Sequence, residues 1–216
     1  MSLADITIIG TPPLALGAAF SVIADMHEAF ADHAPGLIPG ISKRSCVMAS
    51  LTVRDFLRMA GFEAEVRAGM FMAEAWDSNG KVTHTLGVGT TDWRKGKVFR
   101  RQKQGSDPDG WKGHLVCITG EWLIDSTLFQ ARRPTWPQLP GMFALPINRL
   151  PNVYRGMDAL ATLMAGNPTN GDQVRLTWLD QRRNRYWQTV PDAGFARRAP
   201  VVRHMLARLG SPIPQK

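Results

Sequence analysis

The segment that most constrains the fold is 113–127, GHLVCITGEWLIDST. Residues 114–119 and 122–127 are rich in β-branched and aromatic residues and alternate along the chain, which favours two β-strands. Gly120-Glu121 forms a two-residue turn between them, and glycine at the first turn position favours type II′ geometry. The sequence therefore predicts a tight antiparallel hairpin.

A two-residue turn also fixes the register of this hairpin. Cys117 then lies opposite Ile124, and His114 lies opposite Thr127. Because side chains alternate between the two faces of a sheet, His114 and Asp125 share one face as diagonal neighbours. At that separation, about 7–8 Å between the backbones, long side chains reach each other. The hairpin thus predicts an imidazole oriented by a carboxylate.

A second feature lies upstream, where Cys46 begins a helical pattern. Apolar residues recur at helical spacing over about 46–60. Ser42 or Ser45 can cap this helix, and Gly61 is typical of the residue that follows a helix end. We therefore expect Cys46 in the first turn, on the buried side of the helix.

The rest of the chain contains further periodic segments. The predicted helices are 14–33, which follows Pro12-Pro13, 153–164 and 199–209, and the predicted strands are 63–75, 82–90, 143–147, 174–179 and 186–190, the last two as a hairpin. Loops or turns are expected at 34–42, 78–80, 95–111 and 167–172. This order predicts an α+β fold, with helices packed on an antiparallel β-sheet.

The length of 216 residues favours one domain over 1–216, with a core of about 12–150 and a basic C-terminal extension of about 172–216. The net charge is +8, and from Arg175 onward nine Lys and Arg residues stand against Asp180 and Asp192. Such a region permits an anionic partner, nucleic acid or an acidic protein. A solvated basic surface is the alternative, because no nucleic-acid-binding motif accompanies the charge.

The sequence also limits the setting of the protein. No apolar run reaches the length of a membrane span, and the N-terminal segment lacks the basic start of a signal peptide and carries Asp5. We therefore expect a cytoplasmic protein without membrane association. Two cysteines, with no CxxC pair, form neither a disulfide framework nor a zinc-site pattern. No metal and no cofactor are expected.

Cys46, His114 and Asp125 together suit nucleophilic catalysis. A cysteine attacks as its thiolate, which is favoured at a helix N-terminus and beside an imidazolium. Lys43 and Arg44 add positive charge there. His114 would accept the thiol proton and return one to the leaving group, and Asp125 would orient the ring. Backbone N–H groups near Cys46 could form an oxyanion hole.

Other assignments remain open from the residues alone. A cysteine on a buried helix face is often only a small apolar side chain, and a lone strand histidine is often structural. Cys117 is the rival nucleophile, but it points to the face opposite His114. His84 is the rival base, but no aspartate lies at a matching cross-strand position. The combination of features favours Cys46.

The motifs that carry this chemistry resemble the transglutaminase-like superfamily of the papain-like cysteine-enzyme fold. The similarity lies in SCVMASLTVRDFLRMAGFEAEVRAG (45–69), GHLVCITG and EWLIDST, within about 40–130. The order Cys, His, Asp and the HLV of the histidine strand are also similar to arylamine N-acetyltransferases. Two family patterns differ here, because 43–45 is Lys-Arg-Ser in place of Arg-Gly-Gly and His-Ala-Trp is absent. The segment 125–130 resembles uncharacterised bacterial and phage members.

This resemblance implies a catalytic triad of Cys46, His114 and Asp125, with the nucleophile at a helix N-terminus packed on an antiparallel sheet. The expected function is a cysteine-dependent hydrolase or acyltransferase that acts on amide or acyl bonds of a peptide, protein or small acyl substrate through a Cys46 thioester. The alternative is a catalytically inactive protein of the same fold that binds nucleic acid or an acidic partner through its basic C-terminal region.

Overall fold

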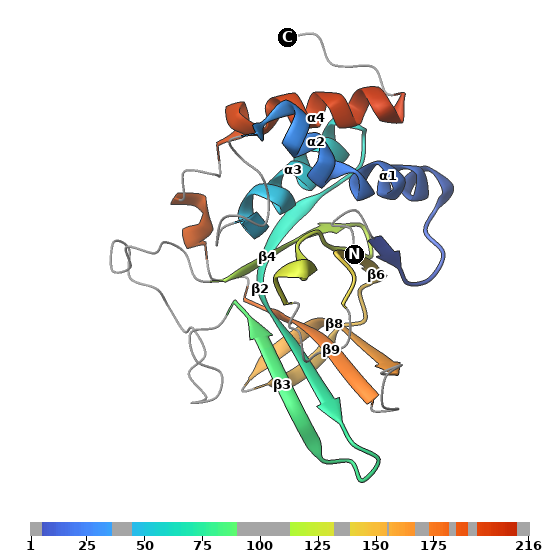
Figure 1. Ribbon diagram of the computed structural model, residues 1–216, viewed down its shortest axis with the longest axis vertical. Helices are drawn as coiled ribbons and strands as arrows, with labels where there is room; N and C mark the ends of the chain where they lie inside the picture. Colours follow the sequence, from blue (N-terminus) through green and yellow to red (C-terminus); the bar gives the residue numbers. More distant parts are fainter. Residues whose placement is uncertain are drawn as a thin grey trace.

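The chain forms four α-helices, nine β-strands and two short 3₁₀ helices within the residues that the computed structural model describes, namely 6–35, 45–89, 113–131, 139–154, 156–166, 173–181, 185–189 and 194–210 (Figure 1). The α-helices are α1 (Leu14–Ala24), α2 (Met26–His33), α3 (Ser45–Met59) and α4 (Phe195–Leu209). The 3₁₀ helices are η3 (Leu128–Ala131) and η4 (Tyr186–Thr189). The strands are β1 (Ile6–Ile8), β2 (Glu65–Trp76), β3 (Val82–Val88), β4 (His114–Thr119), β5 (Trp122–Asp125), β6 (Met142–Pro146), β7 (Leu150–Tyr154), β8 (Met157–Gly166) and β9 (Gln173–Asp180).

All nine strands belong to one sheet, in the order β1-β6-β5-β4-β2-β9-β8-β7. β3 and β4 both pair with the same edge of β2, β4 with its first half and β3 with its second half. The α+β class is thus confirmed, but the sheet is mixed, because β1 pairs with β6 in parallel. The prediction of a purely antiparallel sheet was wrong at this pair, since β1 is a three-residue strand that gives little periodic signal.

The sheet curls strongly around its long strand β2. The ring centroids of Phe143 on β6 and Trp178 on β9 are only 5.8 Å apart. These strands are four positions apart in the sheet, about 19 Å if it were flat. β2 permits the curl because 65–69 pairs with β4 and 71–76 pairs with β3. The concave face therefore encloses an apolar core of its own.

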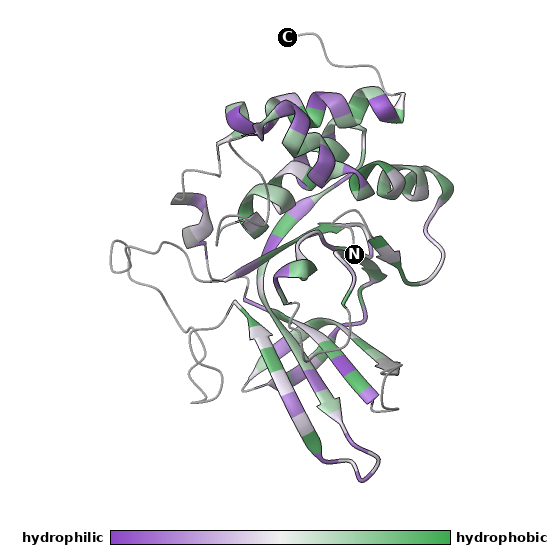
Figure 2. Cartoon of the chain, viewed as in Figure 1, coloured by the Kyte–Doolittle hydropathy of each residue, from purple (hydrophilic) through white to green (hydrophobic). Residues whose placement is uncertain are grey.

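The helices cover the other face of β4, β5 and β6. α3 packs along β4, and α4 contacts α1, α2 and α3 (Figure 1). Their apolar side chains meet Cys117, Ile124 and Ala144 from the strands in a second core. Figure 2 shows α1 as hydrophobic along most of its length, whereas α4 mixes hydrophobic and hydrophilic residues. The hairpin of β2 and β3 projects away from the helical layer (Figure 1).

The predicted helix over 14–33 is in fact two helices. They meet at Asp25 with a bend of 48°, and the bend allows both to bury apolar residues against α4. In the described part of the chain, no single helix is long and apolar enough to cross a membrane; α1 and α2 reach that length and composition only as this bent pair.

Several other predictions can be compared with the structure. The strands at 63–75, 82–90, 143–147 and 174–179 and the helix at 199–209 are confirmed as β2, β3, β6, β9 and α4, with shifted ends. The predicted helix over 153–164 was wrong, because this Ala-, Leu- and Met-rich segment is extended in β7 and β8 and pairs with β9. The predicted strand 186–190 was also wrong and is η4. The loops 95–111 and 167–172 and most of 34–42 lie outside the described residues.

Candidate functional site

The predicted hairpin and its register are confirmed by the pairing of β4 with β5. Cys117 lies opposite Ile124 and Thr119 opposite Trp122. Gly120 has a φ of 53°, the left-handed value that the first position of a type II′ turn requires. This geometry places His114 at the start of β4 and Asp125 at the end of β5, on one face of the sheet.

His114 and Asp125 form a direct, buried pair. His114 Nε2 lies 2.7 Å from Asp125 Oδ2, and the two side chains are 2% and 0% exposed. Burial alone would lower the pKa of His114, but the charge and hydrogen bond of Asp125, with smaller contributions from Cys46, raise that pKa to about 10. Asp125 therefore stabilises a proton on this ring, which makes His114 a stronger base. Burial opposes ionisation of Asp125, yet its partners, His114 first, lower its pKa.

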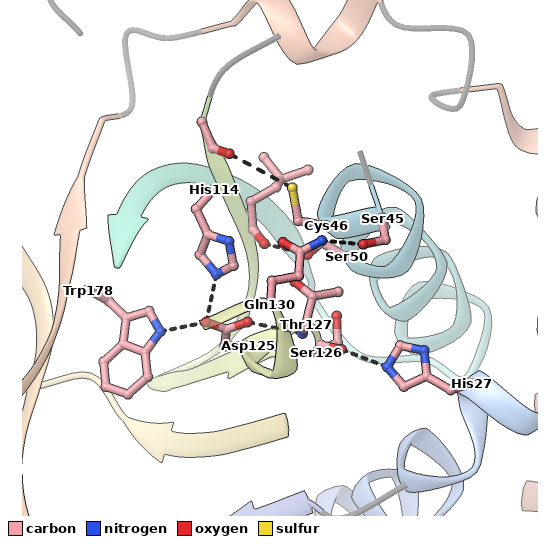
Figure 3. A network of polar contacts seen from close by, with 12 residues as sticks. His27, Ser45, Cys46, Ser50, His114, Asp125, Ser126, Thr127, Gln130 and Trp178 are labelled. Atoms are coloured by element: carbon pink, nitrogen blue, oxygen red, sulfur yellow. Dashed lines mark hydrogen bonds and ion pairs between the residues drawn. The ribbon is translucent and has the colours of Figure 1, made fainter. Parts of the chain in front are cut away.

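Two further donors hold the Asp125 carboxylate. The indole Nε1 of Trp178 donates to Oδ2 at 2.8 Å, and the backbone N–H of Thr127 donates to Oδ1 at 3.1 Å. Figure 3 shows His114 and Trp178 converging on Asp125 from different strands. Sequence reasoning missed Trp178, because it lies 53 residues from Asp125 and its strand gave no sign of where it would pair.

Cys46 is the second residue of α3 and so lies in its first turn, as predicted, and its side chain is 2% exposed. The thiol makes a long contact of 4.0 Å to the backbone carbonyl of Gly113, the residue before His114. Figure 3 shows the sulfur on the side of the imidazole that carries Nδ1. Nδ1 is buried and has no hydrogen-bond partner among the described residues. This nitrogen is therefore free to take the thiol proton.

Two hydrogen bonds attach the first two turns of α3 to β4 and to η3. Ser50 donates from Oγ to the carbonyl of Leu115 at 2.6 Å. Gln130, in η3 just after the hairpin, donates from Nε2 to Ser45 Oγ (Figure 3). The start of α3 is thus tied to β4, which carries His114, and to η3, which follows the strand that carries Asp125.

His27 is a second buried histidine near the site. Its Nε2 lies 2.8 Å from the carbonyl oxygen of Ser126, the residue after Asp125. Burial lowers the pKa of His27 to about 4, an effect only partly opposed by this hydrogen bond. The neutral ring therefore donates to Ser126 from Nε2. This bond links α2 to the residue that follows Asp125.

Neither rival residue joins the triad. Cys117 is fully buried on the helix-covered face, where burial strongly raises the pKa of its thiol. His84 lies opposite Ala75, six residues along β2 from Gly69, the position that faces His114. At about 3.3 Å per residue this is roughly 20 Å. Both side chains are therefore outside the reach of the His114–Asp125 pair.

Three of the nine basic residues of the C-terminal region form ion pairs with acidic residues of other elements. Arg175 pairs with Glu74 at 2.5 Å, Arg198 with Asp55 at 2.6 Å, and Arg208 with Asp25 at 2.6 Å. Arg198 is 1% exposed. These three guanidinium groups link different elements of the fold.

A cavity of about 620 Å³ lies next to the apolar cluster that contains Cys46. Its wall includes Arg67, Ala68, Arg185 and Trp187. Ala68 belongs to the same apolar cluster as Cys46, and Trp187 packs against that cluster.

The described side chains contain no group of three or more His, Cys, Asp or Glu residues that could hold a metal ion. No protein-family model, curated protein or solved structure matches the chain.

Proposed function

We propose that this protein is a cysteine-dependent hydrolase or acyltransferase, in which Cys46 forms a thioester with the acyl part of an amide or acyl substrate. The observation that carries the proposal is the buried His114–Asp125 pair, whose remaining ring nitrogen has no hydrogen-bond partner among the described residues and faces the side of Cys46. A histidine with only a structural role in the core would not need a thiol at a helix start beside its second ring nitrogen. A base that activates a nucleophile needs this arrangement.

The reaction follows from these positions. His114 Nδ1 takes the proton of the Cys46 thiol, and the imidazolium is stabilised by Asp125. The sulfur attacks the carbonyl carbon, and the oxygen becomes an oxyanion that backbone N–H groups of the first turn of α3 can stabilise. Collapse breaks the bond to the leaving group, which receives the proton from His114. Water or an amine then attacks the thioester, with His114 as base, and the thiol is restored.

A transglutaminase-like or papain-like core is the finer reading of the fold. It is supported by the chain order of Cys46, His114 and Asp125, by the nucleophile in the first turn of α3, and by the packing of α3 along β4. The acyl acceptor decides between hydrolase and transferase. Two free, buried cysteines suit a reducing compartment, and we propose a cytoplasmic location.

The test uses p-nitrophenyl acetate as the acyl donor and the full chain. Wild type should acquire one acetyl group on Cys46, visible by mass spectrometry, with a burst of p-nitrophenolate. Cys46→Ala should acquire none, His114→Ala should react far more slowly, and Cys117→Ala, the matched control, should behave as wild type. In parallel, NMR titration of His114 should give a pKa near 10.

Two results together would contradict the proposed function. Absence of the adduct, together with titration of His114 near its ordinary value of 6.5, would show that neither nucleophile nor base is activated. Salt-sensitive binding of nucleic acid by the same inactive protein would then favour the binding function of the basic region.

A further inference from the structure

The Asp125 carboxylate is held by more than the histidine it orients. Oδ2 accepts two hydrogen bonds, from His114 Nε2 at 2.7 Å and from Trp178 Nε1 at 2.8 Å. Oδ1 accepts the backbone N–H of Thr127. A carboxylate with 0% exposure needs such donors to remain ionised, since water does not reach it. Trp178 is the one side-chain donor to this group, among the described residues, that takes no part in proton transfer.

The indole of Trp178 is itself fixed. It is 1% exposed, and its ring lies 5.2 Å from that of Phe71 and 5.8 Å from that of Phe143. β9 and β5 are three positions apart in the sheet, about 14 Å if the sheet were flat. Because the sheet is curled, the rigidly packed indole of Trp178 on β9 reaches Asp125 on β5 and donates a hydrogen bond to it.

We infer that Trp178 is a positioning residue that keeps Asp125 ionised and turned so that Oδ2 faces His114. The inference rests on the proposed function. It adds a fourth side chain, from the part of the chain that the sequence set apart as a basic extension. His114 and Thr127 each hold one oxygen of the carboxylate. The third hydrogen bond, from Trp178 to Oδ2, adds to the energy needed to rotate the carboxylate about its Cβ–Cγ bond, and this keeps His114 Nδ1 on the side of Cys46.

The central variant is Trp178→Phe, which removes the N–H donor but retains an aromatic ring beside Phe71. The readout is the rate of iodoacetamide alkylation of Cys46 against pH, followed by mass spectrometry. We expect alkylation below pH 8 to slow about tenfold, the size expected for loss of a hydrogen bond to a charged group. The matched control is Trp122→Phe, a buried tryptophan that packs on Phe20 in the helical layer. Its alkylation rate should remain within about twofold of wild type.

A double-mutant comparison separates positioning from general packing. In the Asp125→Asn background, Trp178→Phe should slow Cys46 alkylation by less than about twofold, because the charge that it holds is already gone. An equal slowing in both backgrounds would show a structural role and overturn the inference. If instead wild-type Cys46 reacts no faster than Cys46 in His114→Ala, the proposed function itself fails, which is a different result.

A measurement on the intact protein covers the case in which Trp178→Phe does not fold. The indole N–H resonance of Trp178 should move in Asp125→Asn and during titration of His114, while the indole resonance of Trp122 stays in place. An unchanged Trp178 resonance in both experiments would contradict the hydrogen bond and the inference with it.

Discussion

Gly89 at the end of β3 lies directly against His114, so that a methyl group on Gly89 would come within 2.6 Å of the His114 backbone nitrogen. The contact arises because β3 and β4 occupy the same edge of β2, one after the other. Gly89 has a φ of 85°, which other residues rarely adopt. The position of the candidate base is therefore set partly by a residue outside its hairpin.

Gly89→Ala should disturb His114 through this contact. We expect a lower melting temperature and slower alkylation of Cys46, because the added methyl group displaces the start of β4. Gly80→Ala is the matched control: Gly80 has a φ of 74° on the same hairpin, but open space surrounds it. It should lose about 1–2 kcal/mol from the left-handed backbone alone and retain Cys46 reactivity. Equal reactivity in the two variants would refute the role of Gly89.

His27 should make the protein less stable in acid. Its pKa is about 4 in the folded state and 6.5 in the unfolded chain, so the unfolded chain binds the extra proton between these values. The free energy of unfolding should therefore fall by about 3 kcal/mol as pH drops from 6.5 to 4. Urea denaturation across this range measures it. His27→Gln, which can still donate to Ser126 but does not titrate, should show a shallower decline; an identical slope would exclude His27 as the cause.

The His114–Asp125 pair should make stability fall in alkali. The folded state retains a proton on His114 up to about pH 10, whereas the unfolded chain loses it near 6.5. This contribution is thus complete below 6.5 and disappears as pH rises through 10. Chemical denaturation from pH 6.5 to 10 should show the decline in wild type and a weaker one in His114→Gln. A decline of the same size in His114→Gln would place its origin elsewhere.

The buried ion pair of Arg198 with Asp55 should be a major link between α4 and α3. Arg198→Met leaves Asp55 with Arg54 as its remaining cation, and we expect a loss of about 3 kcal/mol in the free energy of unfolding. Arg208→Met is the control, because Arg208 is 49% exposed in its pair with Asp25. Its loss should stay below about 1 kcal/mol. Comparable losses in urea denaturation would contradict this difference.

Local signals account for the predictions that were confirmed. A two-residue turn with Gly120 fixes which residues face each other, so the pairing of Cys117 with Ile124 follows from the turn alone. The position of Cys46 in the first turn of α3 followed from the helical spacing of apolar residues. The wrong predictions lie where strand pairing outweighs local preference. Residues 157–166 favour a helix by composition, yet they form β8 because their backbone pairs with β9.

The sequence by itself thus determined the hairpin, its register, and the helix that begins beside Cys46, because each depends on residues close together in the chain. Only the tertiary structure decided that Trp178 reaches Asp125, that Gly89 touches His114, and that His114 Nδ1 faces the thiol. Those contacts depend on how β2 changes partners along one edge and how far the sheet curls. That curvature is a property of nine paired strands together, and no single segment encodes it.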